Sequence, residues 1–334
     1  MPTAILYITD TGLTLAERLK GLYPDAHIMR FIPHSLTEIW ERHKNLIFIM
    51  ATGIVVRSIA PLLKSKKADP AVVVLDERGR FAISLLSGHL GGANELSQKI
   101  AHYLNVEKGT ISPPYSHAVI TTSSDINGLP SLDLWAEENR LVIDDWGLLP
   151  KVMTRFINKG VLKIYMEGRY DLPEEFIAVE GTEEADVIVS RSTRLPGGDG
   201  RLYLRPRDLV VGIGCNSGTS GKEIEEVVRK ALNDNHFAFA AIDSLATVDK
   251  KGNEPGLRSF AERNSFSLIT FPPEELNSVE GMERSDTVFR ATGAYAVSEP
   301  AAILASGKGQ LLIPKVKSGN VTVAVALRDS APSS

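Results

Sequence analysis

His89 stands inside a glycine-rich loop, Ser87-Gly-His-Leu-Gly-Gly-Ala-Asn94, and this segment is the part of the chain best equipped for chemistry. A run of strand-forming residues ends before the loop, and a helix is expected to start at Asn94. Three glycines in five positions cost chain entropy, which is justified where a ligand or another backbone approaches closely. Free backbone N–H groups and the following helix end suit an anion. We therefore predict that His89 faces a ligand; a core histidine bonded to a carbonyl is the alternative.

Two other loops in the first part of the chain follow predicted strands in the same way. Thr52 and Gly53 follow a nearly all-apolar strand and lead into a helix that carries Arg57. Ligands of open α/β sheets collect beyond the carboxyl ends of strands, although a threonine N-cap and a turn glycine would explain this pair without a ligand. Asp125 and Asn127 lie in a later hydroxyl-rich stretch, where Asx-turns are the alternative.

The second half of the chain has its own glycine-rich segment, at residues 212–221. Ser220 and Glu223 have the spacing of a capping box, which accounts for a helix start without any function. The segment nevertheless holds more glycine than a cap requires, and it resembles a dinucleotide-binding turn only loosely. Cys215 has no histidine nearby in the sequence to activate it, which favours a small buried cysteine over a nucleophile.

Four charged residues near the carboxyl terminus complete the candidates. Glu254 and Glu299 each precede a proline at a predicted helix start, where the helix dipole alone favours a carboxylate. Lys315 and Lys317 lie two residues apart on an extended segment, so their side chains share one face. A solvated sheet edge is the alternative explanation for the two lysines.

Composition excludes several classes of protein. The chain has 334 residues, 43% hydrophobic and 23% charged, as expected for a multi-domain globular protein. A net charge of −4 gives no large electrostatic footprint for nucleic acid. The single cysteine excludes an internal disulfide and a thiolate metal cage. The sequence has no Gly-x-Ser-x-Gly elbow, no His-Glu-x-x-His helix and no Cys-x-x-Cys pair. We see no signal peptide and no membrane-spanning apolar run, and therefore expect a cytoplasmic protein.

Alternating strand and helix patterns predict an α/β fold of several domains, with mixed and parallel sheets that carry helices on both faces. We expect an amino-terminal domain with glycine loops over residues 1–122, a small central α/β domain over 123–206 and a carboxy-terminal α/β domain over 207–334. The stretch Arg205–Asp208 has the polar, proline-bearing character of a linker. A hairpin turn is predicted at 77–80, and a strand near Thr287–Arg290.

A series of segments also matches a known family, in the same order along nearly the whole chain: Ala51–Arg57, Asp69–Val74, Ser84–Leu96, Thr121–Pro130, Val211–Cys215, Gly218–Ser220, Glu254–Gly256, Ser298–Ala302 and Lys315–Val323. Through these segments the chain resembles cobalamin biosynthesis protein G. Asn216 stands where the family usually has a basic residue. The resemblance implies the activity of a cobalt-precorrin-5A hydrolase of anaerobic vitamin B12 biosynthesis. Such an enzyme opens a lactone on the macrocycle and releases acetaldehyde to give cobalt-precorrin-5B.

For this reaction we expect His89 to act as general base, with an ordinary pKa near 6.5. Backbone N–H groups around Gly91 and Gly92 would stabilise the oxyanion, and Asp125 or Glu254 would assist fragmentation. We expect the three amino-terminal loops and the lysine segment to face one cleft that holds the macrocycle. The full set of expected substrate-binding residues is Thr52, Gly53, Arg57, Ser87, Gly88, Gly91, Gly92, Asn94, Asn127, Gly214, Thr219, Ser220, Glu299, Lys315 and Lys317.

The resemblance also implies which partners the protein has. We expect no cofactor and no metal ligands, because the cobalt is carried by the cobalt-tetrapyrrole substrate. Neighbouring enzymes of the cobalamin pathway and a second copy of the chain, as a homodimer, are candidate partners, whereas nucleic acid and membrane are not. Two other functions stay open. One is a non-catalytic tetrapyrrole carrier of the same pathway, and the other is a nucleotide-dependent α/β enzyme, which the missing phosphate-binding motif disfavours.

Overall fold

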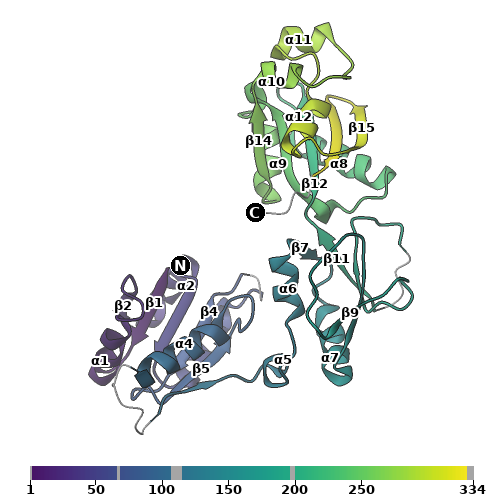
Figure 1. Cartoon of the computed structure of the whole chain (residues 1–334). Helices are drawn as coiled ribbons and strands as arrows, with labels where there is room; N and C mark the ends of the chain where they lie inside the picture. The colour runs from purple at the N-terminus through teal and green to yellow at the C-terminus, as the bar shows by residue number, and fades with distance from the viewer. Residues whose placement is uncertain (1, 66–67, 107–114, 196–199, 329–334) are drawn as a thin grey trace. The chain divides into compact units, whose positions relative to one another are not determined.

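The computed structural model describes residues 2–65, 68–106, 115–195 and 200–328 (Figure 1). The chain divides into two compact units, Met1–Trp135 and Ala136–Ser334. The described residues form one six-stranded sheet and two five-stranded sheets with helices packed on them, which confirms the predicted α/β fold with mixed sheets. No helix in these four ranges is long and apolar enough to cross a membrane.

The first unit is built on the six-stranded sheet, in the order β2-β1-β3-β4-β5-β6. Strands β1 to β4 are parallel to one another, and β5 and β6 run antiparallel to them. The six strands are β1 (Thr3–Tyr7), β2 (His27–Arg30), β3 (Asn45–Ile49), β4 (Ala71–Leu75), β5 (Phe81–Leu86) and β6 (His117–Val119). The predicted hairpin at 77–80 is confirmed, with Gly79 at φ 64° between β4 and β5.

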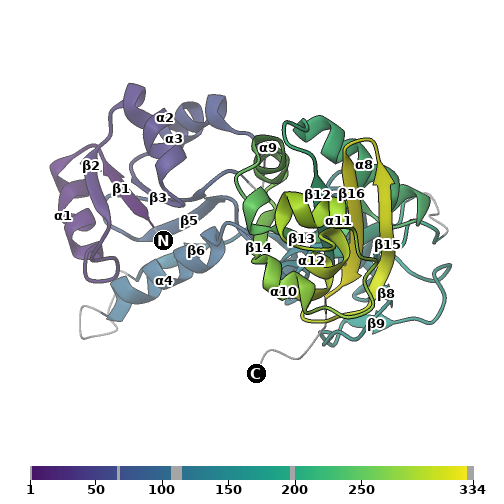
Figure 2. The ribbon, with the colours of Figure 1, turned by 90° about the horizontal axis from the view of Figure 1, so that it is seen from above.

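Helices cover both faces of this sheet (Figure 2). Leu15 and Ile100, from α1 (Asp10–Leu19) and α4 (Ala93–Val106), are buried against one face. Trp40 and Val55, from α2 (Leu36–Arg42) and α3 (Thr52–Ile59), are buried against the other. The unit also contains α5 (Ser123–Ile126) and two 3-10 helices, η1 (Pro33–Ser35) and η2 (Ala60–Leu62).

The direction of β5 decides where the loops of the first unit lie. Leu86, the last residue of β5, pairs with Val72 at the start of β4, whereas Leu75 at the end of β4 pairs with Ala82. The loop after β5 is therefore at the opposite edge of the sheet from the loop after β3. At about 3.3 Å per residue, a five-residue strand separates the two edges by roughly 15 Å. The expectation that the Thr52–Gly53 loop shares a cleft with the His89 loop is wrong.

The second unit contains two sheets. One has the order β7-β11-β10-β8-β9, with β7 antiparallel to β11: β7 (Leu141–Ile143), β8 (Leu162–Met166), β9 (Phe176–Ala178), β10 (Val187–Val189) and β11 (Leu202–Pro206). Helix α6 (Leu132–Glu138) crosses the boundary between the units, and α7 (Leu149–Lys159) contributes Phe156 to the core beside Phe176. The predicted three-domain division at 122/123 and 206/207 stays a prediction.

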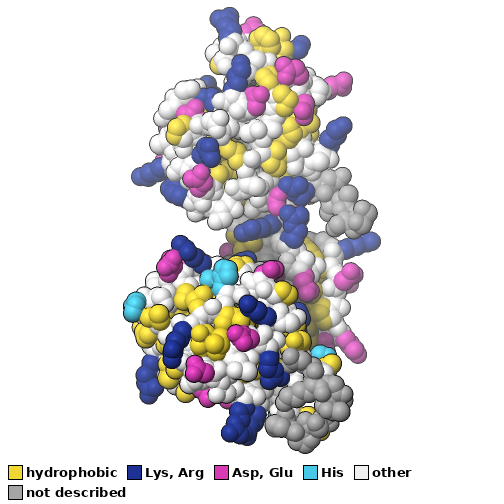
Figure 3. Space-filling view, turned by 90° about the vertical axis from the view of Figure 1, so that its left-hand side faces the viewer, with side chains coloured by type: hydrophobic (Ala, Val, Ile, Leu, Met, Phe, Trp, Pro, Cys, Tyr) yellow, Lys and Arg dark blue, Asp and Glu magenta, His cyan; other side chains and the backbone are white. Residues whose placement is uncertain are grey.

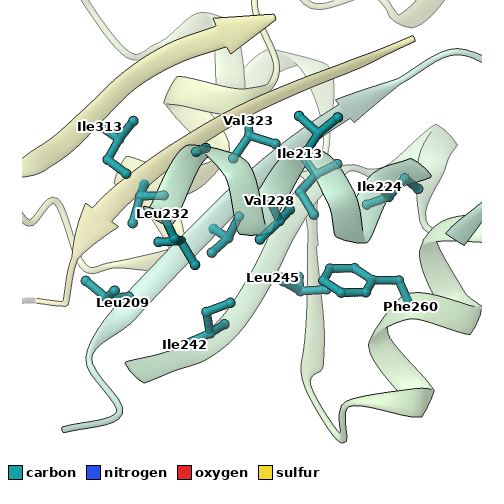
Figure 4. Close-up of a cluster of buried hydrophobic side chains, with 14 of the residues drawn as sticks. Leu209, Ile213, Ile224, Val228, Leu232, Ile242, Leu245, Phe260, Ile313 and Val323 are labelled. Carbon is teal, nitrogen blue, oxygen red and sulfur yellow. The ribbon is translucent and has the colours of Figure 1, made fainter. Parts of the chain in front are cut away.

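The last sheet has the order β14-β13-β12-β16-β15. Its strands are β12 (Leu209–Cys215), β13 (Ile242–Val248), β14 (Ser267–Phe271), β15 (Leu311–Ser318) and β16 (Val321–Leu327). Helices α8 (Gly221–Asp234) and α9 (Pro255–Arg263) bury Val228 and Phe260 against Leu245 and Ile213 (Figure 4). The remaining elements are α10 (Pro273–Asn277), α11 (Asp286–Thr292), α12 (Ser298–Ala305) and two 3-10 helices, η3 (Phe239–Ala241) and η4 (Asp249–Lys251).

Packing explains two glycines of the segment 212–221. A Cβ on Gly212 would lie 1.8 Å from the carbonyl oxygen of Ser298, so only glycine lets α12 approach the strand. A Cβ on Gly214 would lie 2.6 Å from Oγ1 of Thr322 on the neighbouring strand. Close packing thus accounts for Gly212 and Gly214, which a helix cap does not require.

Two predictions of local structure are wrong. Residues 205 and 206 end β11, and Arg205 is only 5% exposed, so the predicted linker shrinks to two residues between β11 and β12. The predicted strand near Thr287–Arg290 is helix α11, because the hydroxyl of Ser285 accepts from the N–H of Val288 at its start and Gly293 ends it at φ 87°. A serine N-cap and a left-handed glycine are helix signals that outweigh the local β-propensity.

Candidate active site

The loop that carries His89 is held by contacts within itself and by a hydrogen bond to Asp69, which precedes β4. Ser87, which follows β5, has a left-handed backbone at φ 57° and donates its hydroxyl to the carbonyl of Asp69 at 3.1 Å. A Cβ on Gly91 would lie 2.3 Å from the Cβ of Ser87, and a Cβ on Gly88 would lie 2.8 Å from Oδ1 of Asn94. These two glycines are therefore needed because other parts of the protein approach them.

The N–H group of Gly92 is already used. It donates to the carbonyl of His89 at 2.8 Å, in a turn where Gly92 has φ 83°. The N–H of Gly91 has no partner among the residues that the structure describes. Of the two groups expected to stabilise an oxyanion, only that of Gly91 is free in this conformation.

The imidazole of His89 lies between two carboxylates. Its Nε2 is 2.7 Å from Oδ2 of Asp125, which is on α5. On the other side, Nδ1 is 3.0 Å from Oγ of Ser131 and 3.6 Å from Oδ1 of Asp133, and Ser131 donates its hydroxyl to Asp133. The His89 side chain is 15% exposed and that of Asp125 is 36% exposed, so the Asp125 side is the one open to solvent.

Asn94 fixes the position of Asp125. It is 6% exposed at the start of α4, and its Nδ2 donates to Oδ2 of Asp125 at 3.0 Å and to Oγ1 of Thr122 at 3.2 Å. Ser84 of β5 donates to Oδ1 of Asn94 at 2.6 Å, which turns the amide NH2 toward Asp125. Since Asn94 and His89 both approach the same oxygen, the carboxylate of Asp125 accepts from two donors.

These carboxylates shift the titration of the histidine. The Asp133 carboxylate raises the pKa of His89, burial acts in the opposite direction, and Asp125 adds to the rise. Burial raises the pKa of Asp133, but its contacts with His89 and Ser131 outweigh this effect and the pKa is lowered. The expected ordinary pKa for His89 is therefore wrong. The raised pKa favours the protonated imidazolium, so His89 is better suited to donate a proton first and to accept one afterwards.

The sequence is similar to characterised proteins over both units. Residues 34–125 match the family described as cobalamin synthesis G N-terminal, and residues 209–326 match cobalamin synthesis G C-terminus. The chain is 38% identical to the cobalt-precorrin-5A hydrolase of Priestia megaterium, over 97% of this chain and 94% of that protein. It is 31% identical to the cobalt-precorrin-5A hydrolase of Salmonella typhimurium, over 97% of each. This chain belongs to the cobalamin biosynthesis protein G family. The resemblance noted in the sequence is thereby confirmed.

The other candidate residues that the sequence suggested in the first unit do not join His89. Ala51, not Thr52, is the N-cap of α3, and the Thr52 hydroxyl has no hydrogen-bond partner in the described part of the chain. Arg57 donates to the carbonyl of Gly53 at 3.0 Å and stays exposed. Asn127 donates to the carbonyl of Ser123 at 2.6 Å and so closes α5. Their roles in substrate binding stay predictions.

In the second unit, the candidates around the start of α8 make structural contacts. Thr219 donates its hydroxyl to the carbonyl of Asn216 at 2.8 Å, and Ser220 caps α8 as expected. Glu254 accepts from the N–H of Gly218 at 2.7 Å and from Nζ of Lys251 at 3.0 Å. The bond from Gly218 and then the lysine lower the pKa of Glu254. A carboxyl group held ionised in this way ties two loops together, and its catalytic role stays a prediction.

The lysine segment and the single cysteine have ordinary surroundings. Oε1 of Glu299 accepts from the backbone N–H of Lys315 at 3.1 Å, and Nζ of Lys315 pairs with Glu283. Lys317 is exposed on the same strand, as is Lys315. Burial raises the pKa of the half-buried Cys215, which agrees with an inert thiol.

Ser131 and Asp133 are the site residues that the sequence analysis missed. They stand at the start of α6, where the Ser131 carbonyl accepts from the N–H of Trp135 at 3.0 Å. A serine followed by an aspartate is typical of any helix start. Nothing in that pattern indicates that the two side chains turn toward a histidine 42 residues earlier in the chain.

Proposed function

We propose that this protein is a cobalt-precorrin-5A hydrolase, which opens the lactone of its substrate and releases acetaldehyde to give cobalt-precorrin-5B. The similarity to proteins of that name extends over 97% of the chain. Within that similarity, the observation that carries the chemistry is the pair formed by His89 and Asp125, in contact at 2.7 Å. A protonated histidine beside an ionised carboxylate supplies an acid and a base in one place.

The reaction needs both groups. Water adds to the lactone carbonyl while losing a proton, and the C–O bond to the ring alcohol breaks while that oxygen gains one. In the second stage the alcohol loses its proton and the adjacent C–C bond breaks. Its electron pair stays on the macrocycle carbon, which takes up a proton, and acetaldehyde leaves. Each stage removes one proton from oxygen and delivers one elsewhere, and the overall change is the consumption of one water.

We assign the first proton delivery to His89 and the first proton acceptance to Asp125. The raised pKa of His89 favours its protonated form, which can donate to the alkoxide as the lactone opens. Asp125 is 36% exposed and can accept a proton from an incoming water. After this step His89 is neutral and can accept the proton of the ring alcohol. This assignment replaces the expectation that His89 acts first as a base.

The substrate brings its own cobalt, and we propose that the protein holds no resident metal. Among the residues that the structure describes, no three His, Cys, Asp or Glu side chains are grouped for a metal ion. The substrate is a polyanion, whereas the face in Figure 3 shows basic and acidic side chains interspersed. We therefore propose that single cations such as Lys315 and Lys317 hold its carboxylates. We also propose a cytoplasmic location for the protein.

The proposal is tested by mixing the purified protein with cobalt-precorrin-5A in H2(18)O. Attack at the lactone carbonyl predicts one acetaldehyde per substrate and one (18)O in the macrocyclic product, found by mass spectrometry. Binding of the substrate, seen in its visible absorption, without any acetaldehyde would instead identify a carrier. Acetaldehyde with no (18)O in the macrocycle would overturn the carbonyl attack but keep the overall activity.

A further inference from the structure

The Nδ1 side of His89 has no part in the proton transfers described above, yet it has two partners. Ser131 and Asp133 approach it from the start of α6, while Asp125 approaches Nε2 from α5. We infer that Ser131 and Asp133 are positioning residues that keep Nδ1 of His89 protonated, so that only Nε2 and Asp125 exchange protons with the substrate. The consequence for catalysis rests on the proposed function, but the position of the proton does not.

The single hydroxyl hydrogen of Ser131 decides which atom donates between Ser131 and His89. A serine hydroxyl has one hydrogen, and here it is donated to Oδ1 of Asp133. The lowered pKa of Asp133 keeps this carboxylate ionised, so it can only accept. Toward His89, at 3.0 Å, the Ser131 oxygen can therefore only offer a lone pair. The hydrogen between the two residues must belong to Nδ1.

Burial restricts the movement of the Asp133 side chain. Asp133 is 8% exposed, and its neighbours on α6, Leu132 and Trp135, are 0% and 5% exposed. The carboxylate is thus fixed by residues anchored in the core and not by a surface loop. A buried carboxylate that loses its hydrogen-bond partners costs free energy, so the contacts of Asp133 are expected to persist.

The two faces of the imidazole consequently differ. On the Nδ1 side the proton is held by a buried chain of Ser131 and Asp133, and on the Nε2 side lies the more exposed Asp125. The remaining neighbour is neutral, since Oγ of Ser124 lies 3.3 Å from Nε2. When His89 gives a proton to the substrate it therefore gives the one on Nε2, and Asp125, which has taken the proton of the attacking water, can donate to the lone pair that is left. This matches the role of an orienting carboxylate in other histidine-based sites, where loss of the carboxylate yields the wrong tautomer.

The test is the (15)N and (1)H NMR of the histidine side chains of the intact protein, with His89 identified by comparison with His89→Gln. We expect neutral His89 to carry its proton on Nδ1. In Asp133→Asn, which removes the charge but keeps the shape, the His89 titration should move to lower pH. Asp25→Asn is the matched control, because Asp25 is exposed in the turn before β2. It should leave the His89 titration unchanged.

A second variant pair separates positioning from folding. Ser131→Ala removes the hydroxyl, whereas Ser131→Thr keeps it. With substrate, we expect Ser131→Ala to lower kcat by roughly 10–100-fold, the usual loss for a group that orients a ligating or catalytic histidine, with little change in KM. Ser131→Thr should restore most of the activity.

Three results would overturn the inference: neutral His89 protonated on Nε2 in the wild type, a His89 titration unchanged in Asp133→Asn, or equal activity of the alanine and threonine variants. A wild-type protein that releases no acetaldehyde would refute the proposed function instead. The NMR measurements would then still decide where the proton lies.

Discussion

Replacing Asn94 with Asp converts a donor in the site into a third carboxylate, beside that of Asp125, without changing the shape of the side chain. Nδ2 of Asn94 is 3.0 Å from Oδ2 of Asp125, so the variant would place two carboxylate oxygens in contact. Two like charges this close do not both stay ionised, and one carboxyl group keeps a proton at a raised pKa. The variant should therefore be less stable, and the loss should depend on pH.

The contacts give the size of the loss. Ser84 and Thr122 can rotate their hydroxyls to donate to the new carboxylate, so two of the three hydrogen bonds survive. The third, to a charged group, contributes about 1.5–3 kcal/mol when buried, and we take the lower end because Asp125 is 36% exposed. At neutral pH the retained proton costs a further amount, about 1.4 kcal/mol for each tenfold increase in the proton affinity of the native carboxyl pair.

The sign of the pH dependence follows from proton binding. The native variant holds a proton that the unfolded chain releases above its ordinary carboxyl pKa of about 4. The cost of the retained proton is therefore absent at lower pH and grows as the pH rises, until the raised native pKa is passed. We expect Asn94→Asp to be clearly less stable at pH 7 than at pH 4.5, relative to the wild type at each pH.

Hydrogen exchange of the amides of α4 and β5 in the intact protein measures this effect locally. Asn94→Ala loses all three hydrogen bonds without adding charge, so its loss of stability should be similar at both pH values. Gln98→Glu adds a carboxylate on the exposed face of the same helix and should change little. If Asn94→Asp and Asn94→Ala behaved alike at both pH values, the contact between Asn94 and Asp125 would not exist as described.

Three further outcomes are expected. Gly91→Ala should lower the stability of the first unit by about 1–3 kcal/mol in chemical denaturation, because its Cβ would lie 2.3 Å from that of Ser87; unchanged stability would show a looser loop. Joint replacement of Lys315 and Lys317 by Ala should weaken binding of a cobalt-corrinoid analogue by roughly 1–3 kcal/mol in absorption titrations, and equal affinity would place both lysines on a solvated edge. A fragment of residues 136–334 should unfold in one cooperative transition, whereas a fragment that starts at residue 207 lacks the Arg191 partner of Asp208 and should be less stable.

The fold class was predictable because apolar strands alternate with amphipathic helices, but the position of the loops depended on strand direction. The hairpin at 77–80 was recognised, and it already requires β5 to run against β4. The antiparallel direction of β5 places the His89 loop at the opposite end of the sheet from Thr52. Helix α11 was not predicted because the short run Thr287–Arg290 favours a strand locally. The residues that start and end the helix, Ser285 and Gly293, lie outside that run.

The candidate site was predictable only in part. His89 and Asp125 each stood out through the loop that carries them, but their contact depends on the parallel pairing of β5 with β6, which brings both loops to one edge. Asp133 gave no signal of its own, since an aspartate in the first turn of a helix is common. The raised pKa of His89 likewise depends on neighbours that only the fold brings together.

The most direct test of the account is the single-turnover rate of acetaldehyde release by His89→Gln with cobalt-precorrin-5A, compared with the wild type. His34→Gln is the matched control, since His34 is exposed in the same unit. If His89 transfers protons with Asp125, the rate should fall by roughly 10²–10⁴-fold while substrate binding is kept. The control should react at the wild-type rate. A His89→Gln variant that releases acetaldehyde as fast as the wild type would contradict the central claim.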